Sequence, residues 1–144
     1  MTKFKLLSLA LGLGLFGVAL AGCHRDVRYQ PPPPVTGDNI TDLKDGWVQL
    51  YAEPGFRGRS LTVKYPKVHS DLANIPADDG TANFNNEARS AKWQLPAGWQ
   101  AVLFVDDNYK GDSFPLVGTG KVEANSDLGT FKGKASSLRW ERKN

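Results

Sequence analysis

The chain has 144 residues, of which 40% are hydrophobic and 23% are charged, and its formal net charge is +3. Without Lys3 and Lys5, which precede an apolar run, 16 basic residues balance 15 acidic ones, a net charge of +1. So small a charge argues against nucleic-acid binding and against electrostatic attraction to anionic membranes. About 120 residues suffice for one domain with a modest core, and a single cysteine allows no disulfide within the chain.

Residues 1–22 have the pattern of a signal peptide. Two lysines supply a positive start, and residues 6–20 form an uncharged run that is short for a helix spanning a bilayer. The run closes with Leu-Ala-Gly-Cys at residues 20–23. This ending resembles the lipobox of bacterial lipoproteins, which implies cleavage just before Cys23 and diacylation of its thiol. An ordinary secretory signal followed by an unpaired cysteine is the alternative.

Residues 23–45 have few large apolar side chains and include four consecutive prolines, Pro31 to Pro34. Such a run favours extended polyproline II structure at roughly 3 Å per residue, so we expect a semi-rigid tether. A proline-rich ligand for a partner domain is the alternative. In the lipoprotein families that the chain resembles, Asp after the cysteine favours inner-membrane retention. His24 occupies that position, so the resemblance implies a lipid-anchored protein of the outer membrane, facing the periplasm or the cell surface.

From Gly46 the sequence repeats one pattern twice. Each copy has an aromatic residue, four residues, a second aromatic residue, one residue and a glycine, flanked by strand-like runs. Glycine permits a positive φ or passage close beneath a ring, and paired aromatic side chains fold a hairpin tip back onto its sheet. The sequence therefore predicts two equivalent hairpins, carried by Tyr51, Phe56 and Gly58 in the first copy and by Phe104, Tyr109 and Gly111 in the second.

The repeat continues to the end of the chain. Ser70-Asp71-Leu72 corresponds to Ser126-Asp127-Leu128, Trp93 corresponds to Trp140, and the first copy is longer by a loop around residues 74–81. Strand-rich halves without a helical period predict an all-β sandwich of two Greek keys. We place its domain at residues 46–144, with motif one at 46–96 and motif two at 97–142. The predicted core includes seven aromatic residues: Trp47, Tyr51, Phe56, Trp93, Phe104, Tyr109 and Trp140.

The two hairpin signatures, a serine before each final strand and the closing tryptophans resemble the βγ-crystallin Greek-key domain family over about residues 46–142. Ala52 and Val105 depart from the family pattern, which usually places a polar or charged residue after the first aromatic. We expect these departures to leave the fold unchanged. An unrelated β-sandwich is the alternative.

Many microbial members of that family bind calcium through Asn or Asp twice, two variable residues, Ser or Thr, and Ser. The resemblance places this segment at Asn85, Asn86, Glu87, Ala88, Arg89 and Ser90, and again at residues 132–137, which end in Ser136 and Ser137. Arg89 brings a cation where the metal needs an oxygen, and Lys132 and Lys134 oppose a divalent ion at the second segment. We therefore expect no cofactor, weak or absent calcium binding, and stronger binding after Arg89→Ser. Alternatively, Ser90 and Ser137 bond to the folded hairpin of the neighbouring motif.

Few residues suggest catalysis. His69 is the only histidine of the predicted domain, it has no cysteine to pair with, and no Gly-x-Ser-x-Gly motif is present. Residues 118–121, Gly-Thr-Gly-Lys, lack the first glycine and the following hydroxyl residue of a phosphate-binding loop. We expect a turn there, and a protein that is not an enzyme.

Two functions agree with these features. The first is a non-enzymatic, lipid-anchored β-domain of the bacterial envelope, with a structural or stress-protective role or an envelope protein as partner. The second is an inhibitor or immunity protein against a protease or another envelope-directed hydrolase. A long exposed loop would favour the inhibitor, and the insertion from Asn74 to Thr81 is the only candidate.

Overall fold

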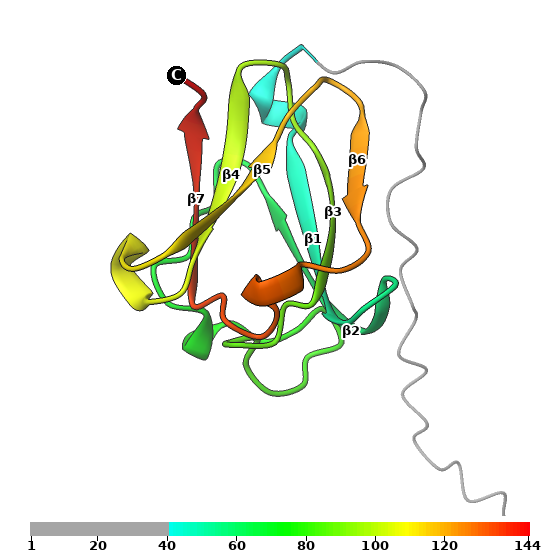
Figure 1. Ribbon diagram of the computed structural model, residues 1–144, viewed down its shortest axis with the longest axis vertical. Coiled ribbons are helices and arrows are strands. Elements are labelled where there is room, and N and C mark those ends of the chain that lie inside the picture. Colours follow the sequence, from blue (N-terminus) through cyan, green and yellow to red (C-terminus); the bar gives the residue numbers. More distant parts are fainter. Residues whose placement is uncertain (1–40) are drawn as a thin grey trace, which may run out of the picture.

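A computed structural model of the chain describes residues 41–144 (Figure 1). The expected signal peptide, Cys23, His24 and the proline run lie outside the described residues. Within residues 41–144, seven strands form two antiparallel sheets, ordered β2-β1-β3-β6 and β5-β4-β7. None of the helices in this part of the chain is long and apolar enough to cross a membrane.

The elements have the following bounds. The first sheet contains β1 (Trp47–Glu53), β2 (Arg57–Lys64), β3 (Ser90–Gln94) and β6 (Val122–Asn125). The second contains β4 (Trp99–Phe104), β5 (Ser113–Val117) and β7 (Ser137–Arg142). Short 3-10 helices connect the strands: η1 (Leu43–Asp45), η2 (Leu72–Asn74), η3 (Asp107–Tyr109) and η4 (Gly129–Phe131).

The two motifs share one strand across the sandwich. β6 belongs to motif two, yet it pairs with β3 of motif one, with Trp93 opposite Glu123. The reciprocal segment of motif one forms only an isolated bridge, between His69 and Leu138 of β7. Because each motif completes its pairing with a segment of the other, the halves form one unit. The predicted all-β sandwich of two Greek keys is confirmed.

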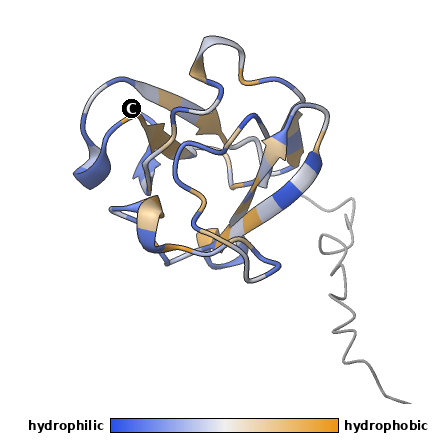
Figure 2. Cartoon of the chain, turned by 90° about the horizontal axis from the view of Figure 1, so that it is seen from below, coloured by the Kyte–Doolittle hydropathy of each residue, from blue (hydrophilic) through white to orange (hydrophobic). Residues whose placement is uncertain are grey.

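The core lies between the sheets and is mainly aliphatic. Side chains alternate across a strand, so Val48, Leu50 and Ala52 of β1 face the core while the residues between them face outward. In Figure 2, hydrophobic (orange) and hydrophilic (blue) segments both occur along the strands. Val105 also packs against the core, so the two departures from the family pattern place apolar side chains where burial suits them. Leu43 of η1 joins the same core, ahead of the predicted domain start.

The predicted aromatic core is only partly correct. Of the seven residues, only Trp93 belongs to the core cluster between the sheets, and Trp140 packs at its margin. Trp47, Tyr51 and Phe104 are buried, but on the outer faces of their sheets, because the alternation of β1 and β4 points their neighbours inward. The hairpin tips that cover the latter two leave Phe56 and Tyr109 half-buried.

The insertion of motif one lies along the edge strand β2. The Asp78 carboxylate accepts hydrogen bonds from Thr62 N (2.9 Å), Thr62 Oγ1 (2.8 Å) and Ser60 Oγ (2.9 Å). Asp78 N donates to Ser60 O at 2.7 Å, and the neighbouring Ala77 is buried. The loop therefore covers a sheet edge and satisfies part of its backbone.

Candidate functional site

A buried serine holds each hairpin tip. Ser90 Oγ donates to Glu53 O at 2.6 Å and accepts from Phe56 N at 3.0 Å. In motif two, Ser137 Oγ donates to Asp106 O at 2.7 Å and accepts from Tyr109 N at 3.1 Å.

Each serine therefore binds the hairpin of its own motif, and the expected bond to the neighbouring motif is wrong. The reason is strand pairing: Ser90 lies opposite Tyr51, and Ser137 lies opposite Phe104. The final strand of a motif thus brings its serine directly to the first strand of the same motif.

The aromatic pairs fold as the spacing predicts, and each carries a cation. Tyr51 and Phe56 meet edge to face with ring centroids 5.8 Å apart, and Phe104 and Tyr109 do so at 6.0 Å. Lys92 Nζ lies 4.6 Å from the Phe56 ring centroid. In motif two the Arg139 guanidinium lies 5.1 Å and 5.3 Å from the two rings. Sequence reasoning missed these cations, although each directly precedes the closing tryptophan of its motif.

The glycines of the signature adopt the left-handed backbone that the pattern predicts. Gly58 has a φ of 75° and Gly111 a φ of 73°. A Cβ at Gly111 would lie 2.5 Å from Asp106 Oδ2 and from Val105 Cγ2, so a side chain there would collide with the turn as well as strain it.

The two segments that resemble calcium sites, residues 85–90 and 132–137, contact each other across the motifs along a line that we call the seam. Asn86 N donates to Ala135 O at 2.9 Å, and Gly133 N donates to Ala88 O at 2.8 Å. Ser136 Oγ contacts Asn86 Oδ1 at 3.3 Å. The structure therefore brings Asn86 together with Ser136, whereas Ser90 and Ser137 form hydrogen bonds with the hairpins of their own motifs.

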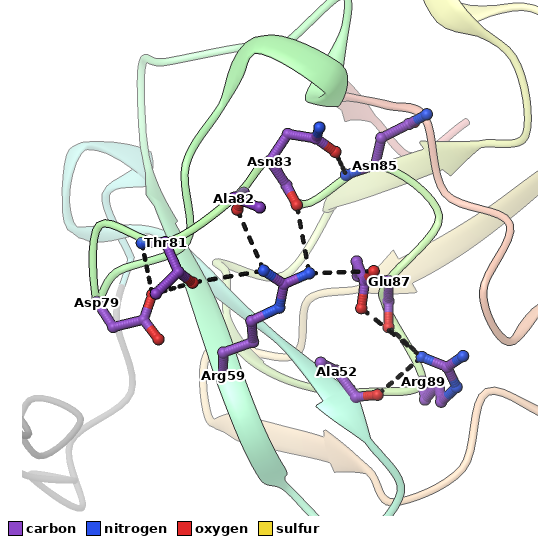
Figure 3. A network of polar contacts seen from close by, with 9 residues as sticks. All are labelled: Ala52, Arg59, Asp79, Thr81, Ala82, Asn83, Asn85, Glu87 and Arg89. Carbon is purple, nitrogen blue, oxygen red and sulfur yellow. Dashed lines mark hydrogen bonds and ion pairs between the residues drawn. The ribbon is translucent and has the colours of Figure 1, made fainter.

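Arg89 points toward the hairpin of motif one (Figure 3). Its Nη1 donates to Ala52 O at 2.9 Å and to Glu87 O at 3.2 Å. The side chain of Asn85 lies apart from this guanidinium, on the far side of Glu87 in the view. A positive group already occupies these carbonyl oxygens, so this end of the seam does not fit a divalent cation.

Arg59 extends the same polar network to the insertion. It forms an ion pair with Glu87 at 3.0 Å and donates to Thr81 Oγ1 at 3.4 Å and to Ala82 O at 3.3 Å (Figure 3). Together with the bonds of Asp78, these contacts attach the insertion to the sheet. Most residues of the insertion nevertheless remain exposed, including Asn74, Pro76 and residues 78–81.

A polar groove opens at the other end of the seam, near the hairpin of motif two. Asn85 Oδ1 is buried there and has no hydrogen-bond partner among the described residues. Within residues 41–144, no three His, Cys, Asp or Glu side chains gather closely enough to hold a metal ion. Amide, hydroxyl and carboxylate oxygens are nevertheless the donors that a hard cation prefers. The groove is lined by Asp71, Asn85, Asn86, Val105, Asp106, Asp107, Lys110 and Ser136.

His69 takes part in the fold through its backbone. His69 N donates to Leu138 O at 3.0 Å, and Leu138 N donates back at 2.8 Å. Its side chain is half-buried, and this burial, followed by the charge of Lys67, lowers its pKa below the usual 6.5. Through these contacts His69 has a structural role, because its backbone pairs with β7. Residues 118–121 connect β5 to β6, as expected of a turn.

No family model and no curated protein matches the chain. Solved structures of βγ-crystallin domains share its fold, among them the following two. One comes from work on the evolution of the eye lens βγ-crystallin domain fold. It is 21% identical to this chain with a TM-score of 0.54, and the match covers 74% of this chain and 92% of the other. A βγ-crystallin from Ciona intestinalis is 19% identical with a TM-score of 0.50, and the match covers 66% and 99%. At these identities the likeness shows the fold: residues 41–144 adopt the βγ-crystallin arrangement.

Proposed function

We propose that this βγ-crystallin-type domain is the non-enzymatic module of a bacterial envelope lipoprotein, anchored through the lipid on Cys23. The order of the chain supports the proposal most directly: a lipobox-like ending at residues 20–23, a proline-rich tether, and then a folded domain. Two or three acyl chains anchor a protein stably where one chain is marginal. The domain has a structural or stress-protective role, or it binds an envelope protein.

The polar side chains of the domain support a structural role. Ser90 and Ser137 hold hairpins, Arg89 bonds to backbone carbonyls, and Asp78 fastens the insertion. Groups that are satisfied in this way stabilise the fold and are not poised to react. This use of its polar groups fits a rigid module better than a catalyst.

The anchor is tested by labelling cells with radioactive palmitate. We expect Cys23→Ser to lose the label and to leave the membrane fraction, because no second cysteine can take the lipid. His24→Asp is the matched control: it keeps Cys23, should label as the wild type does, and should shift from the outer to the inner membrane. Unchanged labelling of Cys23→Ser would refute the anchor.

A second candidate function is weak calcium binding in the polar groove. The observation in its favour is Asn85 Oδ1, which is buried without a partner beside Asn86 and Ser136. Lys110 lines the same groove and opposes a divalent ion. We expect a dissociation constant weaker than about 10 µM, within the roughly 10⁻⁴–10⁻³ M range of extracellular modules.

Calorimetry with Ca²⁺, and with Mg²⁺ for comparison, tests this candidate. Asn86→Ala should weaken the binding at least severalfold, because it removes the amide oxygen next to Ser136. Arg89→Ser is the control, since Arg89 lies at the other end of the seam, and it should leave the groove unchanged instead of strengthening it. Binding that survives Asn86→Ala, or the absence of heat in every variant, would reject the groove as a calcium site.

The inhibitor or immunity alternative depends on the insertion, whose residues are mostly exposed. The insertion is fastened by Asp78 and Arg59. A pull-down from an envelope extract with the unlipidated chain would decide between the roles. Capture of a hydrolase, together with inhibition of that hydrolase, would favour the inhibitor over the structural module.

A further inference from the structure

Five consecutive exposed residues begin with the last residue of β2 and contain both of the large hydrophobic side chains that are exposed within residues 41–144. These are Tyr65, 37% exposed, and Val68, 48% exposed. The segment, residues 64–68, has the sequence Lys-Tyr-Pro-Lys-Val. Bulky apolar groups and cations are therefore presented together at one place on the described surface.

Two tryptophans extend this segment into a larger surface. Trp140 of β7 meets the Tyr65 ring edge to face at 6.1 Å, and its Nε1 donates to Lys67 O at 2.6 Å. Arg142, also on β7, places its guanidinium 5.0 Å from the ring centroid of Trp99, its register partner on the adjacent strand β4. We define the docking surface as residues 64–68, Trp99, Trp140 and Arg142.

The charges of this surface are available to a partner. Lys64, Lys67 and Arg142 form no ion pair within residues 41–144, which is also true of cations elsewhere on the domain such as Lys110 and Lys134. The near-zero net charge of the sequence argued against attraction to anionic membranes, but net charge does not report where the unpaired cations lie. Trp and Tyr combined with Lys and Arg are the residues enriched at membrane–water interfaces.

The docking surface lies where the chain enters the domain. Tyr65 N donates to Gly46 O at 3.0 Å, directly after η1. In Figure 1, η1 and the end of β7 occupy the same end of the sandwich, opposite the insertion. Cys23 lies only 19 residues before Asp42, which allows at most about 65 Å of extended chain. A lipid on Cys23 would thus keep this end of the domain within reach of the membrane.

We propose that this surface docks on the bilayer that carries the Cys23 lipid, with Tyr65 and Val68 in the interfacial layer and Lys64 and Lys67 against anionic headgroups. The proposal rests on the lipid anchor proposed above. Because the anchor holds the domain at a high local concentration, a weak contact is enough to orient it. The insertion and the polar groove then face away from the membrane.

The experiment uses the unlipidated chain from residue 24, which retains the complete core, since the core cluster spans Leu43 to Leu138. It is sedimented with vesicles of phosphatidylcholine alone and of phosphatidylcholine with 30% phosphatidylglycerol, at millimolar lipid. We expect binding to the anionic vesicles that decreases in 0.5 M salt. Tyr65→Ser combined with Val68→Ser should reduce binding at least fivefold.

Matched charge variants locate the contact. Lys64→Gln with Lys67→Gln should abolish the preference for anionic vesicles, whereas Lys110→Gln with Lys134→Gln, the same charge change elsewhere, should leave it intact. The four substituted lysines are exposed, so both lysine variants should melt as the wild type does. No binding by the wild type, or equal losses in both lysine pairs, would overturn the docking surface.

The proposals for the docking surface and for the lipid anchor are tested by separate measurements. Palmitate labelling of Cys23 reports the anchor whatever the vesicles show, and vesicle binding by the unlipidated chain reports the surface whatever the labelling shows. If Tyr65→Ser with Val68→Ser instead abolishes capture of an envelope protein and leaves vesicle binding unchanged, the surface belongs to a protein partner and the membrane proposal is overturned.

Discussion

The hairpins of motif one and motif two are held by the same bonds, yet the rest of the two motifs differs. Ser90 and Ser137 make equivalent pairs of hydrogen bonds, with lengths that agree within 0.1 Å. Each closing tryptophan also reaches into the opposite motif, where Trp93 Nε1 donates to Val117 O at 2.8 Å and Trp140 Nε1 donates to Lys67 O at 2.6 Å. The serine bonds within each motif and the tryptophan bond from each motif to the other therefore repeat closely.

The differences lie where the motifs meet each other or the solvent. Motif two contributes the full strand β6 to its partner, whereas motif one contributes a single bridge at His69. Trp93 is 9% exposed and belongs to the core, whereas Trp140 is half-buried at its edge. Internal repetition fixes the hairpins, and the asymmetric exchange between the halves decides which surfaces remain open.

The largest effect should distinguish the two tryptophans. Trp93→Ala should lower the free energy of unfolding by about 3–5 kcal/mol because it empties a buried site, and Trp140→Ala by roughly 2 kcal/mol because part of that ring already faces water. Urea denaturation at pH 7 measures both. If Trp93→Ala fails to fold, Trp93→Phe against Trp140→Phe preserves the comparison. Equal losses would contradict the asymmetry.

The second-largest loss of stability should be the same in both motifs. Ser90→Ala and Ser137→Ala each leave a backbone N–H and a carbonyl without their partner, at a cost of about 1–3 kcal/mol. Ser113→Ala, at an exposed position, is the control and should change stability little. Losses that differ by more than about 1 kcal/mol between Ser90 and Ser137 would show that the two hairpins are not energetically equivalent.

A smaller effect should appear only in motif one. Asp78→Ala removes three hydrogen bonds to β2 and should cost about 1 kcal/mol, since the carboxylate is exposed. It should also make the insertion more sensitive to proteolysis. Asp79→Ala is the matched control, because Asp79 bonds to Thr81 within the loop and not to the sheet. Equal protease sensitivity of the two variants would contradict the fastening role of Asp78.

The smallest effect should depend on pH. Burial lowers the pKa of His69 in the folded state, so the unfolded state takes up the proton first as the pH falls. This contribution to stability is fully present above about pH 6.5 and decreases below it, toward the folded pKa. Urea midpoints at pH 7.5 and 5.5 should differ more for the wild type than for His69→Gln. The same difference in both proteins would assign the pH dependence to other groups.

The carboxylates affect the stability of the fold in a separate pH range. The backbone N–H of Gly129, followed by Lys132, lowers the pKa of Asp127. A carboxylate with a lowered pKa loses its contribution only as the pH falls below its ordinary value of 3.8. Measurements between pH 7.5 and 5.5 therefore isolate the histidine.

Features that depend on nearby residues could be predicted from the sequence. The spacing of Tyr51, Phe56 and Gly58 indicates a folded hairpin because the ring pair and the positive φ act within a few residues of each other. The partners of Arg89 and Asn86 could not be predicted in this way. The first bonds to Ala52 O and the second to Ser136, at separations of 37 and 50 residues.

By itself the sequence determined the two-fold repeat, the all-β class and the two hairpins, because hydrophobic alternation and turn spacing are local properties of the chain. Only the tertiary structure decided that the core is mainly aliphatic, that the calcium-like segments pair across the motifs, and that the insertion lies on β2. It also gathered Tyr65, Trp99 and Trp140 on one surface. These outcomes depend on which strands of the two sheets pair and on which face of each strand is covered, and local periodicity does not specify either choice.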